Sequence, residues 1–499
     1  MADEPKAPSL FRNIVSLIGL IIAVVALANI IFFAAIEFRG ESTNQYAGIL
    51  AYMIIPAFLI LGLILFFAGA LLERRRRHHA APDEVPRMPI LNLNDRRHRI
   101  LTFAFIVGGA VFAMVSTVGA YEAYHYSDSV KFCGTTCHDL MIPEYTAYLN
   151  SPHARVPCVD CHVGPGATWF VRYKFDGMYQ VYATLFKKYP KPIPTPVSNL
   201  RPAQDTCEQC HWPAKFWGSQ LKTFNHFMYD EQNTPRETQM LLKVGGGEAG
   251  GEGIHWHMNI ANEITYVAAD RQRQVIPWVQ MRNRNTGEVI EYTLRDTDMT
   301  PEQIAAGEKR LMDCVECHSR PSHIYSPPDQ AVDQALLMRK LDPTLPWIKQ
   351  QAVATLSKDY PSTDAAMEGI QNDLTGFYQA NHPDVLQSRR PVVESAIAAT
   401  QTIFRTNMFP EMKVDWRTHV NNVGHLYYPG CFRCHDDNHV SKDGKVIRKD
   451  CEICHEVVEQ KLAGNPMTEM TSAPFEHPVD LGDMTMFNCV DCHTGAGME

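Results

Sequence analysis

Charged residues are missing from three long stretches near the start of the chain, roughly Ile14–Ile36, Ala47–Leu72 and Ile100–Ala120. Each stretch has about the 20 residues that a helix needs to cross ~30 Å of hydrocarbon. A buried helix of a soluble protein is seldom this long without a single charge, so the absence argues against an entirely soluble protein. We therefore expect three transmembrane helices in a membrane anchor that spans residues 1–123.

The chain also lacks the sequence features of a cleaved signal peptide and of a phosphate-binding loop. The first stretch lacks the positive flank and the small-x-small site of a cleaved signal peptide, since Lys6 and Arg12 are offset by Asp3 and Glu4. We expect it to be retained as an anchor. The glycine-rich segment at 245–253 lacks the lysine and the serine or threonine of a phosphate-binding loop, so we interpret it as a flexible loop.

The loop at residues 73–99 carries eight arginines, whereas the short loop between the first two stretches carries only Arg39. The positive-inside rule places the arginine-rich loop in the cytoplasm and everything after the third helix outside. Nucleic acid or anionic lipid could also attract such a run. Because topology alone explains the arginines, we expect a multi-pass protein of the cytoplasmic membrane with no nucleic-acid partner.

No cysteine stands alone: all 14 fall into seven close pairs, and a histidine follows each pair directly. Two thiols on one tight turn can reach the two vinyl groups of a porphyrin, and the next histidine can donate a nitrogen to its iron. Disulfides, zinc sites and thioredoxin-like motifs also use paired cysteines, but none requires that histidine. We therefore predict seven covalently attached c-type haems.

The predicted attachment residues are Cys133, Cys137, Cys158, Cys161, Cys207, Cys210, Cys314, Cys317, Cys431, Cys434, Cys451, Cys454, Cys489 and Cys492. The predicted proximal iron ligands are His138, His162, His211, His318, His435, His455 and His493. The first segment, CGTTCH, has three residues between its cysteines instead of two. We interpret it as a stretched variant of the same attachment.

Seven irons also need sixth ligands, and eleven further histidines follow the third hydrophobic stretch. This supply suffices for two histidines at most sites, and such closed sites favour electron transfer over substrate binding. The distal candidates are His153, His226, His257, His323, His419, His425, His439 and His477, with Met141 for the first iron. His255 and His257 would face the same way on a strand, so we favour only one of them, His257. His125 and His382 are substitutes, and spacing does not say which histidine serves which iron.

For the part outside the anchor we expect a mainly α fold with little regular secondary structure, packed around the seven haems. We divide it into residues 124–217 with the first three haems, a haem-poor insert at 218–313, residues 314–430 with the fourth haem and a helical scaffold, and residues 431–499 with the last three haems. The division follows the positions of the cysteine pairs.

Local signals predict several elements in this part. The proline-rich segment Tyr189–Pro202 reads as an extended connector. Residues 274–294 form two β-rich runs that turn at Asn285–Gly287, which predicts a hairpin. Thr300 and Gln303 have the spacing of a capping box at a helix start. Residues 329–409 have apolar positions at helical spacing and read mostly as helices.

With these motifs and this topology, the chain resembles the NapC/NirT family of membrane-bound quinol-oxidising cytochromes, best over residues 101–212. Within that family it is most similar to the seven-haem inner-membrane cytochromes of metal-reducing bacteria. Most members have one anchor helix and four or five haems, and their first motif reads C-x-x-C-H-x-M rather than CGTTCHDLM. The resemblance implies a bacterial inner-membrane protein whose haem domain faces the periplasm. It also implies that menaquinol is oxidised at the first haem and that electrons pass to periplasmic cytochromes or reductases in anaerobic respiration.

Quinol oxidation requires a base that accepts the two quinol protons. The candidates near the first two motifs are Asp139, Glu144, Asp176 and His125, with Lys174 as a hydrogen-bond donor. Two other functions stay open: a terminal multihaem reductase with one open haem, and an electron-transfer subunit of a larger complex without its own quinol site.

The whole chain has a formal charge of −9, and its first 123 residues hold more basic than acidic residues, so the remainder is more negative still. We expect an electron-accepting cytochrome with a basic face as partner.

Overall fold

The structure is a computed structural model of the 499-residue chain. It describes residues 10–11, 13–38, 55–79, 93–136, 138–164, 167–197, 200–246, 253–468, 475–482 and 487–496. The chain folds into two compact units. The first comprises Met1–Ser129 with Val163–Val181, and the second comprises Val130–His162 with Tyr182–Glu499.

The first unit contains the three predicted hydrophobic helices. They are α1 (Ile14–Phe38), α3 (Ile55–His79) and α4 (Arg96–Ser127). In the described part of the chain, the segments Ile14–Ile31 and Ile55–Arg76 are long and apolar enough to cross a membrane. The start of the second predicted span, residues 47–54, lies outside the described residues. Side chains of α4 are described only in part, so its crossing of the membrane stays a prediction.

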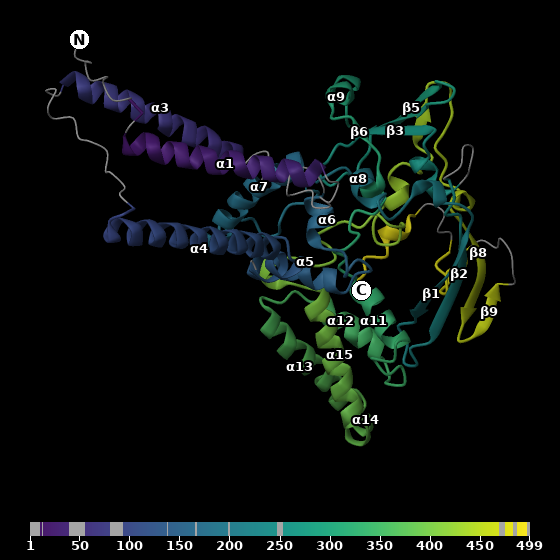
Figure 1. Cartoon of the computed structure of the whole chain (residues 1–499). Coiled ribbons are helices and arrows are strands. Elements are labelled where there is room, and N and C mark those ends of the chain that lie inside the picture. The colour runs from purple at the N-terminus through teal and green to yellow at the C-terminus, as the bar shows by residue number, and fades with distance from the viewer. Residues whose placement is uncertain are drawn as a thin grey trace, which may run out of the picture. The chain divides into compact units, whose positions relative to one another are not determined.

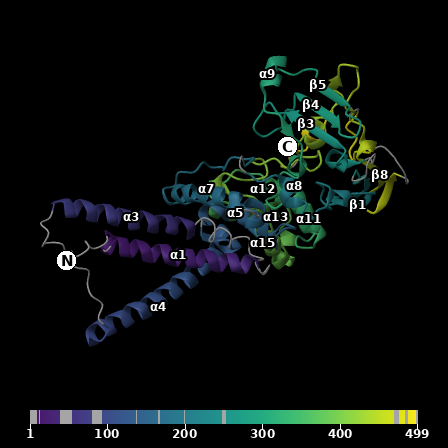
Figure 2. The same cartoon turned by 45° about the horizontal axis from the view of Figure 1, so that its top comes forward.

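Helices α1 and α3 lie side by side, as both views show (Figures 1 and 2). A Cβ on Gly19 would lie 2.3 Å from the backbone nitrogen of Phe66, and one on Gly62 would lie 2.6 Å from that of Ala23. Ser16 donates a hydrogen bond to the carbonyl oxygen of Phe66 at 2.8 Å. Small residues and buried hydroxyls are the usual means by which helices associate in lipid, where apolar burial supplies no net attraction.

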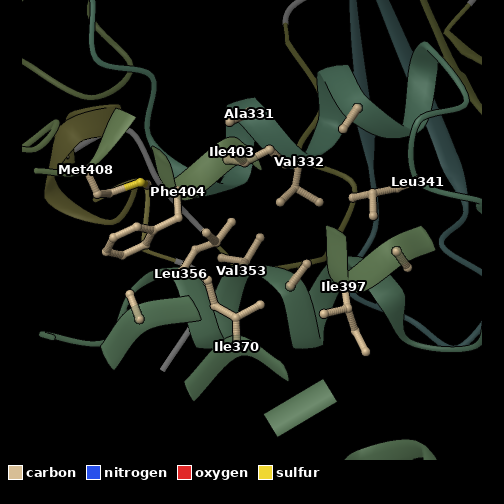
Figure 3. Close-up of a cluster of buried hydrophobic side chains, with 14 of the residues drawn as sticks. Ala331, Val332, Leu341, Val353, Leu356, Ile370, Ile397, Ile403, Phe404 and Met408 are labelled. Atoms are coloured by element: carbon tan, nitrogen blue, oxygen red, sulfur yellow. The ribbon is translucent and has the colours of Figure 1, made fainter. Parts of the chain in front are cut away.

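A helical core lies in the second unit. It is built from α11 (Pro328–Leu337), α12 (Ile348–Leu356), α13 (Thr363–Asn381), α14 (Pro383–Ser388) and α15 (Arg390–Asn407). These helices confirm the prediction for residues 329–409. Figure 3 shows their side chains converging, among them Val332, Val353, Ile370, Ile397 and Phe404. Apolar residues recur three or four positions apart along α15, which gives it one buried face.

Shorter helices lie around the cysteine pairs. They are α5 (His138–Leu149), α6 (Cys158–His162), α8 (Ala203–Cys207), α9 (Pro301–Ala306) and α10 (Cys314–Cys317), while α7 (Ala167–Leu185) runs from the first unit into the second. Thr300 and Gln303 form the predicted capping box at α9. The described residues of the predicted connector 189–202 form neither helix nor strand.

The second unit also contains two antiparallel sheets (Figure 1). One has the order β1 (Gln220–Phe227), β2 (Pro235–Leu242), β8 (His455–Leu462), β9 (Asn465–Thr468). The other has the order β6 (Arg310–Leu311), β3 (Asn262–Val267), β4 (Trp278–Asn283), β5 (Val289–Leu294), β7 (His439–Ser441). The predicted hairpin is β4–β5, and Gly287 takes φ +75° in its turn.

The expectation of a mainly α fold is confirmed in part, because helices make up about half of the chain, while two antiparallel sheets accompany them. The packing of this part around seven haems stays a prediction. Both sheets combine strands of the 218–313 region with strands from 439–468. Such pairing joins segments more than a hundred residues apart. Local sequence patterns carry no signal for it.

Leu336 and Leu337 offer a matched test of the helical core, since they are neighbours on α11. Leu336 is 0% exposed and Leu337 is 51% exposed. We expect Leu336→Ala to lower the free energy of unfolding by about 2–5 kcal/mol, because it leaves a cavity. Leu337→Ala should change it by about 0.5 kcal/mol or less. Urea unfolding followed by far-ultraviolet circular dichroism measures both, and equal losses would contradict this core.

Candidate functional site

Each described cysteine pair sits on a single tight turn. The backbone N–H of the histidine that follows donates to the carbonyl oxygen of the first cysteine in four motifs, over distances of 2.7 to 3.0 Å; these are the motifs that end at His211, His318, His435 and His493. Such a turn brings two thiols and one imidazole together. The first motif differs: Phe132–Thr136 forms a wider π-helical turn, which accommodates its additional residue. Cys137 and the side chain of His138 lie outside the described residues.

The described cysteines form no disulfide among themselves. In the same part of the chain, no three histidine, cysteine or acidic side chains gather as a metal ion held by protein alone would require.

Six of the predicted proximal histidines each face a second imidazole, among the residues that the structure describes. The ring centres lie 6.1 Å apart in His153–His211, 6.3 Å in His162–His323, 6.5 Å in His255–His318, 5.9 Å in His257–His435, 6.0 Å in His425–His455 and 6.2 Å in His477–His493. An imidazole nitrogen binds a metal at about 2 Å, so two rings on opposite sides of one metal have centres about 6 Å apart. The observed spacing is the one that a shared iron requires.

In most pairs, the histidine that faces the proximal one is held in place by a contact at its Nδ1. Nδ1 contacts a backbone carbonyl oxygen in His153 (3.1 Å, Pro321), His255 (2.7 Å, Val244), His257 (2.9 Å, Ile254), His323 (3.0 Å, Glu144) and His477 (3.0 Å, Val479). Histidines that bind metals commonly use the second nitrogen in this way, which sets the tautomer and the ring orientation. Nε2 is thereby left for the iron.

The expectation that only one of His255 and His257 faces an iron is at odds with the structure. The segment Ile254–Met258 is a 3₁₀ helix rather than a strand. Residues two apart then point in different directions. His255 faces His318 and His257 faces His435, so the same short helix supplies two pairs.

Two other distal candidates, His226 and His439, face no proximal ring among the described residues. His439 is fully buried, with Nδ1 on Asp436 at 2.9 Å and Nε2 on the carbonyl oxygen of Ile276 at 2.7 Å. Neither nitrogen is left for iron, so the structure contradicts this candidate. His226 contacts Asp333 through Nδ1 at 3.1 Å, and no proximal ring stacks on it among the described residues.

His419 differs from these two histidines because one of its ring nitrogens has no hydrogen-bond partner in the described structure. Its Nδ1 contacts the Thr195 hydroxyl at 3.0 Å, and its Nε2 is buried without a hydrogen-bond partner in the described structure. A buried polar atom without a partner is costly. This nitrogen therefore fits a ligand such as iron. Burial lowers the pKa of His419 to about 4, and nearby Arg320 adds to this, so the ring is neutral and able to coordinate.

Comparison with known proteins supplies the family. A model described as "NapC/NirT cytochrome c family, N-terminal region" matches residues 95–192. A relative named "Cytochrome c-type protein ImcH", from Geobacter sulfurreducens, is 43% identical over 497 residues, which cover 99% of this chain and 97% of the relative. The chain belongs to the NapC/NirT cytochrome c family. No solved structure matches it significantly.

As a NapC/NirT cytochrome, the chain carries covalently bound haem c and serves as a membrane-anchored electron-transfer protein. The paired thiols and the imidazole pairs fit this group. The bound haem supplies one-electron redox chemistry, and its potential depends on the axial ligands, on hydrogen bonding and on burial. The polypeptide supplies the ligands, sets their orientation and excludes water.

The quinol-base candidates of this NapC/NirT cytochrome differ in their surroundings. His125 is exposed near the end of α4, and Asp176 is half-buried on α7. The side chains of Asp139 and Lys174 lie outside the described residues. Glu144 is largely buried on α5 and forms an ion pair with Arg320 at 3.1 Å. Its carboxylate also lies 3.3 Å from Nδ1 of His323.

Electrostatics make Glu144 a poor proton acceptor. Burial acts to raise the pKa of Glu144, but Arg320 and then His323 outweigh it, and the pKa lies below its ordinary value. The carboxylate is thus ionised and already engaged. Its position suits holding the His323 ring in place rather than accepting a proton from substrate.

Glu144→Gln tests this arrangement. The change leaves the Arg320 guanidinium buried without a carboxylate, and breaking a buried ion pair in this way costs about 3–5 kcal/mol. Glu308→Gln is the control, since Glu308 is 77% exposed in its pair with Arg310. We expect the melting temperature of the purified protein to fall in the first variant and to stay unchanged in the second. A stable Glu144→Gln protein would contradict the role given to Glu144.

Proposed function

We propose that the chain is a seven-haem quinol dehydrogenase of the bacterial inner membrane, which oxidises menaquinol and passes the electrons to a periplasmic acceptor. The six imidazole pairs carry this proposal. An iron with an imidazole on both sides has no open position for a substrate, so such sites transfer electrons. This argues against a terminal reductase.

The first motif is the proposed entry point. Cys133 follows the last residue of α4, Ser127, after only five intervening residues. Six residues of fully extended chain span roughly 20 Å, so the first haem would lie close to the end of the proposed third membrane helix. A quinol held there gives up two electrons and two protons. Asp139, Asp176 and His125 are the proposed proton acceptors, with Lys174 as hydrogen-bond donor.

His419 is the proposed sixth ligand of the first iron, and Met141 is its alternative. His419 is the distal candidate with a buried, unpartnered Nε2. It interacts electrostatically with Glu144, on the same helix α5 that begins at His138. A methionine in its place would raise the potential of that haem.

Acidic residues exceed basic ones outside the anchor, and the haem propionates would add negative charge. An acceptor cytochrome with a basic face would be steered to this surface. The proposed topology places the arginines at the end of α3 and the start of α4 in the cytoplasm, and the haem domain in the periplasm. A second candidate function, an electron-transfer subunit without its own quinol site, shares every feature except the entry point.

Quinol oxidation is tested with the purified, haem-loaded protein. We expect a menaquinol analogue alone to reduce it, seen as growth of the haem α-band in stopped-flow spectra. One of three substitutions should remove the true base: Asp139→Asn, Asp176→Asn or His125→Gln. That variant should be reduced by the quinol analogue about 10²–10⁴-fold more slowly, with an unchanged haem content. Glu308→Gln is the exposed control. No reduction of the wild-type protein by quinol would favour the subunit without a quinol site.

The pairing of imidazoles is tested by distal substitution. His255→Gly should convert one of the seven low-spin ferric haems to high spin, because the iron facing His318 loses its sixth ligand. His382→Gln should leave all haems low-spin, since the His382 imidazole packs on the rings of Phe377 and Tyr378 and on no proximal histidine among the described residues. Electron paramagnetic resonance of the oxidised protein measures the haem spin states in both variants. A low-spin His255→Gly protein would refute this pair.

A further inference from the structure

The last turn of α7 carries a group of exposed apolar side chains. Leu185 is 74% exposed, the next residue Phe186 is 62% exposed, and Tyr182 is 43% exposed. They stand three and four positions after Tyr182, so all three share one side of the helix. Ala183 points away from them and is 6% exposed. Single exposed apolar residues are ordinary, whereas a contiguous group marks a surface that contacts another molecule or a membrane.

The fold holds this group in a defined arrangement. The rings of Tyr182 and Phe186 pack with their centres 4.9 Å apart. The Lys188 ammonium donates a hydrogen bond to the Tyr182 hydroxyl at 2.9 Å. The next residue, Tyr189, packs against the helical core of the second unit. The apolar side chains are therefore exposed on a structured surface rather than on a frayed helix end.

Lysines occupy the turn that ends α7. The backbone N–H of Lys187 donates to the carbonyl oxygen of Thr184 at 3.2 Å. That of Lys188 donates to the carbonyl oxygen of Ala183 at 2.7 Å, which completes a Schellman motif. Lys187 takes φ +51° at the position where such motifs usually have glycine. The turn thus places two cations directly beside the apolar group, at a backbone cost that glycine would avoid.

The charge of the surrounding sequence has one sign. No acidic residue lies between Asp176 and Asp205, in a part of the chain that is otherwise more acidic than basic. Its basic residues are Lys187, Lys188, Lys191 and Arg201. Lys191 is engaged, since it donates to the carbonyl oxygen of Glu411 at 2.8 Å. The two lysines of the turn are exposed. An aromatic and apolar surface edged by cations complements anionic phospholipid headgroups.

The course of α7 favours a membrane over a partner protein as the occupant of this surface. Residues Val163–Val181 belong to the compact unit that contains the anchor helices, and Tyr182 is the first residue of α7 beyond it. The exposed group is therefore continuous in sequence, on one helix, with the part of the chain that the bilayer holds. A soluble partner would have no such connection.

We propose that Tyr182, Leu185, Phe186, Lys187 and Lys188 form a lipid-binding patch, which inserts its apolar side chains into the interface of the same membrane and binds anionic phospholipid headgroups through its lysines. Aromatic rings and lysines are the side chains typical of that depth, because rings lie among the headgroups and lysine stems reach the phosphates. The patch is a second membrane contact besides the anchor helices. Two contacts limit how far the haem domain can tilt, and they hold the second cysteine pair, just before α7, near the bilayer. The inference goes beyond the proposed function, since it requires only the membrane anchor.

Photo-crosslinking in a bilayer tests the apolar part of the lipid-binding patch. The full-length, haem-loaded protein carries p-benzoylphenylalanine in place of Leu185, in nanodiscs of phosphatidylglycerol and phosphatidylcholine. The matched control carries it in place of Leu337, which is 51% exposed on α11. After irradiation, mass spectrometry should show at least tenfold more phospholipid adduct at position 185 than at position 337. Equal yields would overturn the patch, and so would an adduct with another polypeptide instead of lipid at position 185 in native membranes.

Removal of charge tests the lysines of the patch. In Lys187→Gln/Lys188→Gln, the phospholipid adduct at position 185 should fall several-fold. A similar fall should follow in the protein with both lysines when phosphatidylcholine replaces phosphatidylglycerol. The control Lys340→Gln/Lys442→Gln removes two exposed lysines elsewhere and should leave the adduct unchanged. Equal falls in the two double variants would reflect net charge alone and would overturn the role of the two lysines.

These measurements do not depend on quinol, so the patch and the quinol site can fail separately. Haem content and the visible spectrum check that each variant folds. If the adduct forms but a menaquinol analogue does not reduce the protein, the patch stands and the quinol site fails. If the analogue reduces the protein and position 185 gives no adduct above that of position 337, the patch alone is refuted.

Discussion

The spacing between two imidazole rings is the constraint on which the rest of this fold depends. An iron between them tolerates only a narrow range of separations, so two histidines from distant segments must be held face to face within a few tenths of an ångström. The described pairs satisfy this over separations as large as 178 residues along the chain, in His257–His435. The backbone carbonyls that hold Nδ1 of the distal rings complete the orientation.

Regular structure supplies the rigidity that these pairs need. Strand β8 begins at a proximal histidine and pairs with β2 of the 218–313 region. The helical core of α11 to α15 has no cysteine, yet Leu140 of α5 and Tyr229, which follows β1, pack against it. A scaffold with its own apolar core keeps its shape independently of the haems, and a set of ligands benefits from being positioned before the metal arrives.

Two largely buried ion pairs occur next to haem motifs. Glu144 with Arg320 lies beside His323, and Glu316 with Arg273 lies inside the fourth motif. Buried pairs contribute little net stability compared with apolar residues, but breaking one is costly. Here the two ion pairs hold the loop that carries His323 and the turn of the fourth motif in defined positions. Apolar contacts are less directional and would fix these positions less precisely.

Sequence alone determined the chemistry, because thioether attachment needs cysteines and histidine on one local turn, and a local requirement leaves a local signature. It also determined the hydrophobic helices, the β4–β5 hairpin and the cap at Thr300, all of which depend on nearby residues. Only the tertiary structure decided which distal histidine meets which proximal one. The rejection of His439, the separate roles of His255 and His257, and the pairing of the sheets depend on contacts between remote segments. A sequence pattern does not specify the distance between remote segments, whereas the folded chain fixes it.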